Sequence, residues 1–174
     1  MIDRKRASSL LCYEASTGEF RWRVSRGNLR SGAIAGTLDS YGYVQIKIDG
    51  VLILAHRLAW LLTVGDPPPF LDHINGDRSD NRFANLRPAT RRQNAGNRKP
   101  NRGTKTGLKG VRKVAGCSTF RAVIGGSKDR QHLGTFPTAE EAHAAYVAAA
   151  RARYGEFARI GENKLLPPPQ DARS

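Results

Sequence analysis

The segment 71–97, LDHINGDRSDNRFANLRPATRRQNAGN, constrains the fold of this chain more than any other part of it. An acid and an imidazole stand side by side in this segment, at Asp72 and His73. The turn residues that follow them separate two short stretches of strand character, which predicts a hairpin. Thr90, followed three residues later by Gln93, has the spacing of a capping box, so we expect a helix to begin directly after the hairpin.

This arrangement would bring together polar side chains that are far apart in the sequence. Asn85 lies on the returning strand, and Asn94 falls in the first full turn of the helix, facing the hairpin. Asp72 and Asn94 would then offer oxygen ligands to one hard cation, with His73 beside it. An oxygen-ligated cation and a neutral imidazole suit phosphodiester hydrolysis. The alternative is that Asp72 and His73 only cap a turn, since Asn is itself common in turns and caps.

Positive charge is concentrated in the part of the chain that begins within this segment. The formal net charge is +14, and residues 81–128 contain thirteen Lys or Arg and no Asp or Glu. A block of one sign repels itself unless a polyanion neutralises it, so nucleic acid is the favoured partner. A solvated basic face and a surface for anionic lipid are the alternatives, but no amphipathic membrane helix accompanies the charge.

Turn signals and periodicity organise the rest of the chain. Residues 8–54 have the pattern of short strands separated by turns, and 56–62 that of a short apolar helix closed by Gly65. We expect His56 in that helix to pack in the core, with a role behind the active site or at a DNA phosphate as the alternative. Residues 98–106 contain no apolar side chain and predict a basic linker.

Beyond the linker, the pattern changes to a small mixed module. A second capping box at 138–141 starts a helix that Gly155 stops. Three strands are expected before it, over 108–114, 119–124 and 131–136. Residues after Ile160 are rich in proline and polar side chains, and we expect them to fray.

Cysteine usage and the N-terminus limit the cellular setting. Cys12 and Cys117 lack CxxC spacing, so a thiolate zinc site is not expected, and a reducing cytoplasmic setting is the default. The N-terminus has no apolar stretch of the kind a signal peptide needs, and no run of residues could span a bilayer.

Residues from about 11 to 97 resemble the HNH homing endonucleases, whose active site is a ββα-metal motif. The stretches GYVQIKIDG, AHRLAW, DHINGD, DN, NLR and QNAGN carry the likeness. The resemblance implies that Asp72 and Asn94 bind the metal, His73 activates water and Asn85 braces the loop. The last of these positions is Asn rather than His, as in the subset with an Asp/Asn metal pair, which favours Mg²⁺ or Mn²⁺ over zinc.

Residues 107–160 resemble an AP2 DNA-binding domain, through GLKGVRK, HLGTFPTAEEAHAAY and YGEFA. That domain lays a three-stranded sheet into the major groove of DNA. The chain departs from the family in the second strand, where Ser118-Thr119-Phe120 stands at a place that often holds Trp. The departure affects the expected base contacts rather than the fold.

We therefore expect an α+β protein with a β-rich HNH ββα-metal nuclease domain and a small AP2-like domain of three strands and a helix. The expected bounds are 8–97 for the nuclease domain, 98–106 for the linker, 107–160 for the AP2-like domain and 161–174 for the tail. The residues expected to contact DNA are all basic: Arg87, Arg91, Arg92, Arg98, Lys99, Arg102, Lys105, Arg112, Lys113 and Arg121.

The function expected from these features is metal-dependent cleavage of double-stranded DNA, with one chain nicking one strand as a monomer. No membrane partner and no small-molecule cofactor are expected, and the setting would be the cytoplasm of a bacterial or phage-infected cell. Two alternatives are a DNA-binding regulator that does not cleave, and an RNA-binding or intron-binding protein. The basic block fits both, but neither gives Asp72, His73 and Asn94 a task.

Overall fold

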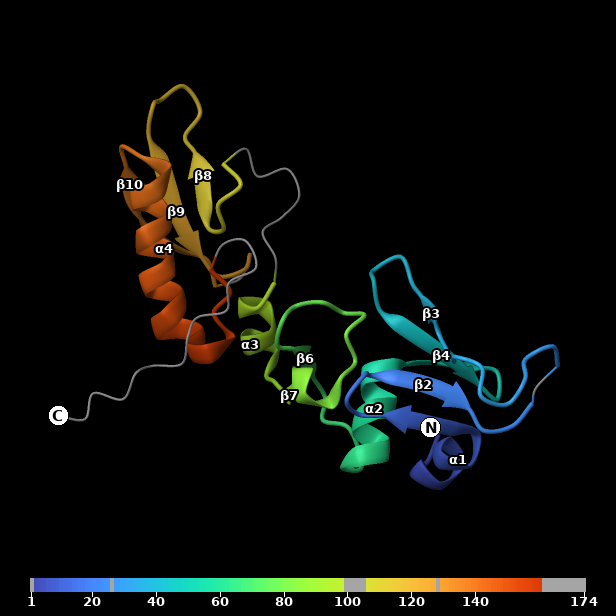
Figure 1. The fold of residues 1–174 in the computed structure, drawn as a ribbon. Helices are drawn as coiled ribbons and strands as arrows, with labels where there is room; N and C mark the ends of the chain where they lie inside the picture. Colours follow the sequence, from blue (N-terminus) through green and yellow to red (C-terminus); the bar gives the residue numbers. More distant parts are fainter. Residues whose placement is uncertain (1, 26, 99–105, 128, 161–174) are drawn as a thin grey trace. The chain divides into compact units, whose positions relative to one another are not determined.

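The computed structural model describes residues 2–25, 27–98, 106–127 and 129–160. It divides into two compact units, Met1–Thr90 and Arg91–Ser174, each of which combines helices with small antiparallel sheets (Figure 1). The expected α+β class is confirmed. In the described part of the chain, no helix is both long enough and apolar enough to cross a membrane.

The first unit is built from three small sheets and two helices. Strands β1 and β2 form one antiparallel pair, β3, β4 and β5 form a three-stranded sheet, and β6 pairs with β7. Its elements in order are α1 (Arg4–Leu10), β1 (Leu11–Glu14), β2 (Glu19–Trp22), β3 (Thr37–Leu38), β4 (Val44–Ile48), β5 (Val51–Leu54), α2 (Ala55–Thr63), β6 (Leu71–His73), the 3₁₀ turn η1 (Phe83–Asn85) and β7 (Leu86–Pro88).

Helix α1 is an element that the sequence analysis missed, because residues 8–10 were assigned to strand-rich sequence and instead end this helix. The Asp3 side chain caps the helix by accepting a hydrogen bond of 2.6 Å from the Arg6 backbone amide. Ala7 and Leu10, three residues apart, are the buried positions of the helix. A single N-cap and two apolar positions are a weak signal, and they are sufficient here because tertiary packing covers the helix.

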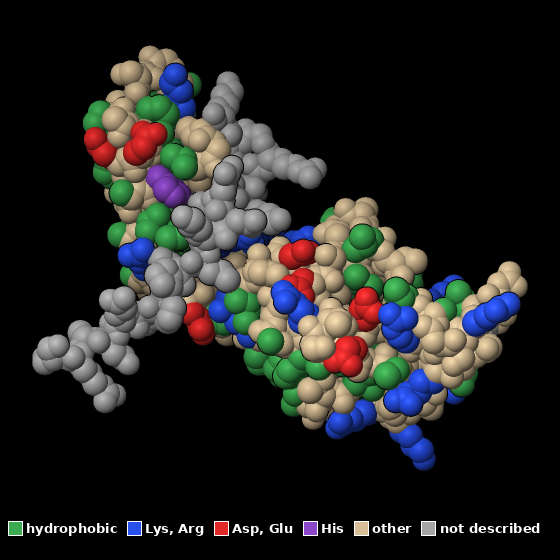
Figure 2. All heavy atoms as spheres, in the orientation of Figure 1, with side chains coloured by type: hydrophobic (Ala, Val, Ile, Leu, Met, Phe, Trp, Pro, Cys, Tyr) green, Lys and Arg blue, Asp and Glu red, His purple; other side chains and the backbone are tan. Residues whose placement is uncertain are grey.

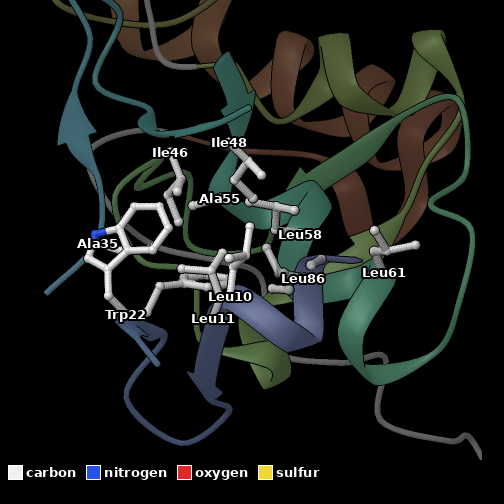
Figure 3. Close-up of a cluster of buried hydrophobic side chains, with 13 residues drawn as sticks. Leu10, Leu11, Trp22, Ala35, Ile46, Ile48, Ala55, Leu58, Leu61 and Leu86 are labelled. Carbon is white, nitrogen blue, oxygen red and sulfur yellow. The ribbon is translucent and has the colours of Figure 1, made fainter. Parts of the chain in front are cut away.

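A continuous hydrophobic core joins the elements of the first unit. Leu11 of β1, Ile46 of β4 and Leu58 of α2 are almost fully buried, and Figure 3 shows side chains from both helices and several strands converging on one another. Leu86 of β7 belongs to the same cluster. The β6–β7 hairpin is therefore fixed to the core through the strand that faces Asp72 and His73.

The second unit contains a three-stranded antiparallel sheet in the order β8-β9-β10, packed against one long helix (Figure 1). The expected helix start at Thr138 is confirmed, because the Thr138 hydroxyl accepts a hydrogen bond of 3.2 Å from the Glu141 amide. Gly155 ends the helix with φ of 55°, as a C-terminal glycine allows. The elements are α3 (Arg91–Gly96), β8 (Val111–Lys113), β9 (Phe120–Ile124), β10 (Gln131–Phe136), α4 (Ala139–Tyr154) and the 3₁₀ turn η2 (Gly155–Phe157).

Helix α3 begins where the capping box at Thr90 predicts it. It lies in the second unit because it packs against α4 and η2. The sequence groups this helix with the nuclease segment, and the domain bounds given above stay predictions. Most of the expected linker and the expected tail lie outside the described residues.

The close approach of the β1–β2 turn to the loop behind β6 gives a stability prediction. A Cβ atom on Gly18, which has φ of +78°, would lie 2.4 Å from the Arg82 amide nitrogen and 2.6 Å from the Asn81 carbonyl carbon. Gly50 has a similar φ of +85°, and a Cβ atom there would meet no described atom within 4 Å. Both alanine variants carry the left-handed backbone strain of about 1–2 kcal/mol, but only Gly18→Ala also overpacks the loop.

We therefore expect Gly18→Ala to lower the free energy of unfolding by at least about 1 kcal/mol more than Gly50→Ala. Urea denaturation of the two variants and the wild type measures the difference. Equal losses for the two variants would contradict the close packing of the turn on the loop.

Candidate active site

Strand β6 carries Asp72 and His73 into the interior of the first unit. The strand pairs with β7 so that Asp72 lies opposite Arg87 and His73 opposite Leu86. Asp72 and His73 are each only 5% exposed. A buried acid next to a buried imidazole is costly unless both are hydrogen-bonded, so their neighbours determine what the pair can do.

Asp72 is held by an ion pair across the hairpin. Its Oδ2 accepts hydrogen bonds from Arg87 Nε at 3.1 Å and from Arg87 Nη2 at 3.0 Å. The Arg87 side chain is itself largely buried. The contact between Arg87 and Asp72 follows from the register of two three-residue strands, and the expected role of Arg87 at a DNA phosphate stays a prediction.

His73 is oriented by Asn81, from the loop that follows β6. The Asn81 Nδ2 donates a hydrogen bond of 3.0 Å to the Ser79 carbonyl, so the Asn81 Oδ1 is turned toward His73 Nε2, at 3.3 Å. An amide oxygen can only accept, so His73 Nε2 carries the proton and the lone pair of the neutral ring is on Nδ1. Burial lowers the pKa of His73 below its ordinary value, against the opposing effects of the Asn81 hydrogen bond and the nearby carboxylates.

Two aromatic rings pack beside His73 and restrict its movement. The His56 ring of α2 lies edge-on to it, with 5.0 Å between centroids and 72° between planes. Tyr43 lies 5.5 Å from His56 and 6.1 Å from His73, and the Arg78 guanidinium stacks over Tyr43 at 4.7 Å. Burial, with the nearby His73 and Arg57, lowers the pKa of His56 to about 3, so this ring stays neutral. The expected burial of His56 is confirmed.

Asn85 spans the loop between the two strands. Its Oδ1 accepts from the Asn75 amide at 3.0 Å, and its Nδ2 donates to the Asp80 carbonyl at 2.8 Å and to Asn75 Oδ1 at 3.1 Å. The loop that delivers Asn81 to His73 is thereby closed at both ends. Asn85 occupies the position that a loop brace would need, although it lies in the turn η1 rather than in the strand expected for it.

Asn81 and Tyr43 were not identified by the sequence analysis as site residues. Asn81 is 2% exposed, and its carbonyl accepts a 2.7 Å hydrogen bond from the Tyr13 hydroxyl. Asn81 follows Asp80 in a loop rich in turn residues. Side chains in such a loop are usually exposed, so there was little reason in the sequence to expect Asn81 in the site. Tyr43 had no local signal, because it lies directly before β4, about 30 residues ahead of His73 in the sequence.

The remaining expected site residues fall into three groups. Asn94 lies in α3 and is half-buried. Lys99, Arg102 and Lys105 lie outside the described residues. The other expected DNA contacts are exposed: Arg91, Arg92, Arg98, Arg112, Lys113 and Arg121.

Two of these exposed residues, Arg112 and Arg121, stand opposite each other on neighbouring strands β8 and β9. On the face of the first unit in Figure 2, by contrast, Lys and Arg are scattered, with Asp and Glu among them.

The hairpin offers one carboxylate, that of Asp72, as an oxygen donor for a hard divalent cation. The described residues contain no group of three or more His, Cys, Asp or Glu that could hold a metal ion. The pair expected from the sequence, the Asp72 carboxylate and the Asn94 amide oxygen, falls below that number. Mg²⁺ is commonly held by one or two carboxylates together with water and substrate phosphate. Asp72, an oxygen donor beside a neutral imidazole, is compatible with such a site.

The β6–β7 hairpin lies in a segment that is similar to a known protein family. Residues 54–96 match the family model of an HNH endonuclease, and this segment runs from the last residue of β5 to the last residue of α3. The chain is also 31% identical over 106 residues to a protein of Acanthamoeba polyphaga mimivirus that is named an HNH endonuclease.

The similarity to the viral protein covers 59% of this chain and 54% of that relative, so the chain spans about half the length of the relative it matches. No solved structure matches the chain significantly. Residues 54–96, which hold the buried Asp72 and His73, are therefore similar to the HNH endonucleases.

Proposed function

We propose that this chain is a metal-dependent DNA endonuclease of the HNH homing type, which hydrolyses one phosphodiester bond and nicks one strand. The observation that carries the proposal is the orientation of His73, neutral, buried beside Asp72 and held at Nε2 by Asn81 inside the matched HNH segment. An imidazole held in this way presents Nδ1 as the atom that can accept a proton.

Asp72 and Asn94 are the residues that we propose to hold Mg²⁺ or Mn²⁺. When bound, such a cation would neutralise charge on the phosphate and on the leaving 3′ oxygen. Arg87 stays beside the Asp72 carboxylate and fixes its direction by two hydrogen bonds. A carboxylate that is held before the substrate arrives needs little rearrangement to act.

His73 would take the proton from the attacking water on the side of the phosphate opposite the leaving oxygen. Asn85 keeps the loop closed at both ends, and Asn81 keeps the His73 ring in one tautomer. His56 and Tyr43 limit the tilt of the ring. The protein itself would thus carry out one proton transfer, from water to Nδ1 of His73.

The second unit would bind DNA as an AP2-like module. Arg112 and Arg121 lie opposite each other on an exposed sheet face, and like charges at this spacing destabilise a sheet. A phosphate backbone laid against that face would relieve the repulsion, with counterion release favouring the complex. Arg91, Arg92 and Arg98 would contact flanking phosphates of the same duplex.

Removal of either proposed metal ligand should abolish cleavage. Asp72→Ala and Asn94→Ala each remove one of two protein ligands from a weakly held cation, while DNA affinity, which comes from phosphate contacts elsewhere, should stay within about threefold. Asp66→Ala and Asn28→Ala are matched controls, because both residues are exposed and lie outside the site. Cleavage by Asn94→Ala at the wild-type rate under saturating Mg²⁺ would show that Asn94 is not a ligand.

Loss of the proposed base should slow the chemical step strongly. His73→Ala should reduce the single-turnover rate by roughly 10²- to 10⁴-fold, the usual contribution of a general base. Asn81→Ala should reduce the single-turnover rate by a smaller factor, because His73 remains and only the hydrogen bond that orients its ring is removed. His73→Ala within about tenfold of wild type would remove His73 from this role.

The dependence of kcat/KM on pH in the wild-type protein should report the titration of His73. Because burial lowers the pKa of His73, its neutral form persists below the ordinary value of about 6.5, and kcat/KM should fall only as the pH drops further.

One chain should cut one strand. The chain contains a single Asp72, His73 and Asn94 set, and one base can serve one phosphate at a time. Supercoiled plasmid should convert to open circles, with linear DNA appearing late. Linear DNA formed at the same initial rate as open circles, with a second-order dependence on protein concentration, would contradict a monomeric nicking enzyme.

A further inference from the structure

Helix α3, which carries the proposed metal ligand Asn94, is weak on its own. It has six residues, Arg91–Gly96, and isolated helices shorter than about 12–15 residues are marginal in water. Its first turn contains Arg91 and Arg92 and no acidic residue, which opposes the helix dipole. The direction of Asn94 must therefore depend on what packs against the helix.

The C-terminal end of α3 rests directly on helix α4. A Cβ atom at Gly96 would lie 2.6 Å from Cγ and 2.9 Å from Cβ of Tyr154, so only glycine permits this approach. Tyr154, in the last turn of α4, is 9% exposed, and both Gly96 and Asn97 are buried. The contact is thus a tight backbone-to-ring packing rather than an adjustable surface.

The last carbonyl of the helix is bound by the same unit. Lys109 Nζ donates a hydrogen bond of 2.5 Å to the Gly96 carbonyl, and the Arg159 backbone amide donates one of 3.3 Å to the same oxygen. A helix leaves its last carbonyls without intrahelical donors, and a cation there is favourable to the dipole. Burial and the nearby Arg159 lower the pKa of Lys109 to about 8, so the ammonium is kept at some cost in solvation.

We propose that Lys109, Tyr154 and Arg159 form an α3-binding surface that positions Asn94. This inference rests on the proposed function, in which Asn94 is a metal ligand. Lys109 is then a positioning residue: it touches neither DNA nor metal and acts through the Gly96 carbonyl. Its proposed effect falls on metal activation and on the chemical step, while DNA binding depends on other residues.

The test uses the full chain with Lys109→Met, which keeps the aliphatic stem and removes the donor. Hydrogen exchange of the free protein should show α3 amides exchanging roughly ten- to a hundredfold faster, as expected for the loss of a hydrogen bond from a charged donor, while α4 amides keep their protection. The Mg²⁺ concentration for half-maximal cleavage should rise and kcat should fall, with the DNA dissociation constant unchanged. Lys47→Met, at an exposed position of β4, is the matched control and should leave all five quantities unchanged.

Two results would overturn the inference. One is α3 exchange in Lys109→Met equal to that in Lys47→Met. The other is faster α3 exchange with unchanged Mg²⁺ dependence and kcat, which would show that the surface holds the helix without positioning Asn94. If Lys109→Met also loses α4 protection, Gly96→Ala tests the Tyr154 contact from the α3 side with the same readouts. A wild-type protein that does not cleave with Mg²⁺ or Mn²⁺ would refute the proposed function and the positioning of Asn94 with it, whereas unchanged exchange beside active wild type refutes the inference alone.

Discussion

The pairing of β6 with β7 is the constraint on which the rest of the site depends. Three residues on each strand place Asp72 against Arg87 and turn His73 inward, and Leu86 fixes the hairpin to the core. Burying an acid and an imidazole is tolerable only because the guanidinium and the Asn81 amide satisfy them. The same burial keeps the imidazole neutral, and the Asn81 amide oxygen keeps it in one tautomer. Stability of the hairpin and chemical competence of His73 therefore have a single physical cause.

Much of this arrangement was predictable from the sequence because its signals are local. The hairpin, the start of α3 at its capping box and the cap of α4 at Thr138 depend on residues close together in the chain. Asn85 closes the loop by hydrogen bonds to Asn75 and Asp80, which lie within ten residues of it in the sequence. Helix α1 could not be predicted because one N-cap and two apolar positions are a weak local signal, and tertiary packing stabilises the helix.

The contacts that sequence reasoning could not give are those between distant segments. Tyr43, directly before β4, and His56, in α2, reach His73 from earlier in the sequence, and Arg87 turns to Asp72 because of strand register. The packing of Gly96 on Tyr154 joins positions 58 residues apart and has no local pattern. Periodicity and caps describe elements, but which elements meet is decided by side-chain shape and charge in three dimensions.

The proposed positioning of Asn94 would couple DNA binding to cleavage. A short helix with unfavourable end charges cannot hold a ligand by itself, and a larger module that binds its C-terminal end can. Under this view, the module that we propose to bind DNA also determines where Asn94 points. Coupling of this kind would restrict cleavage to chains whose C-terminal unit is folded.

The chemistry of the cut ends tests the central claim most directly. Plasmid incubated with the full-length protein and Mg²⁺ or Mn²⁺ should be cut to products with 5′-phosphate and 3′-hydroxyl ends, because water activated by His73 attacks opposite the leaving 3′ oxygen. EDTA should abolish the reaction. Cleavage that persists in EDTA, products with 3′-phosphate ends, or no cleavage with either metal would contradict the assignment of Asp72 and His73 as the centre of a metal-dependent nuclease.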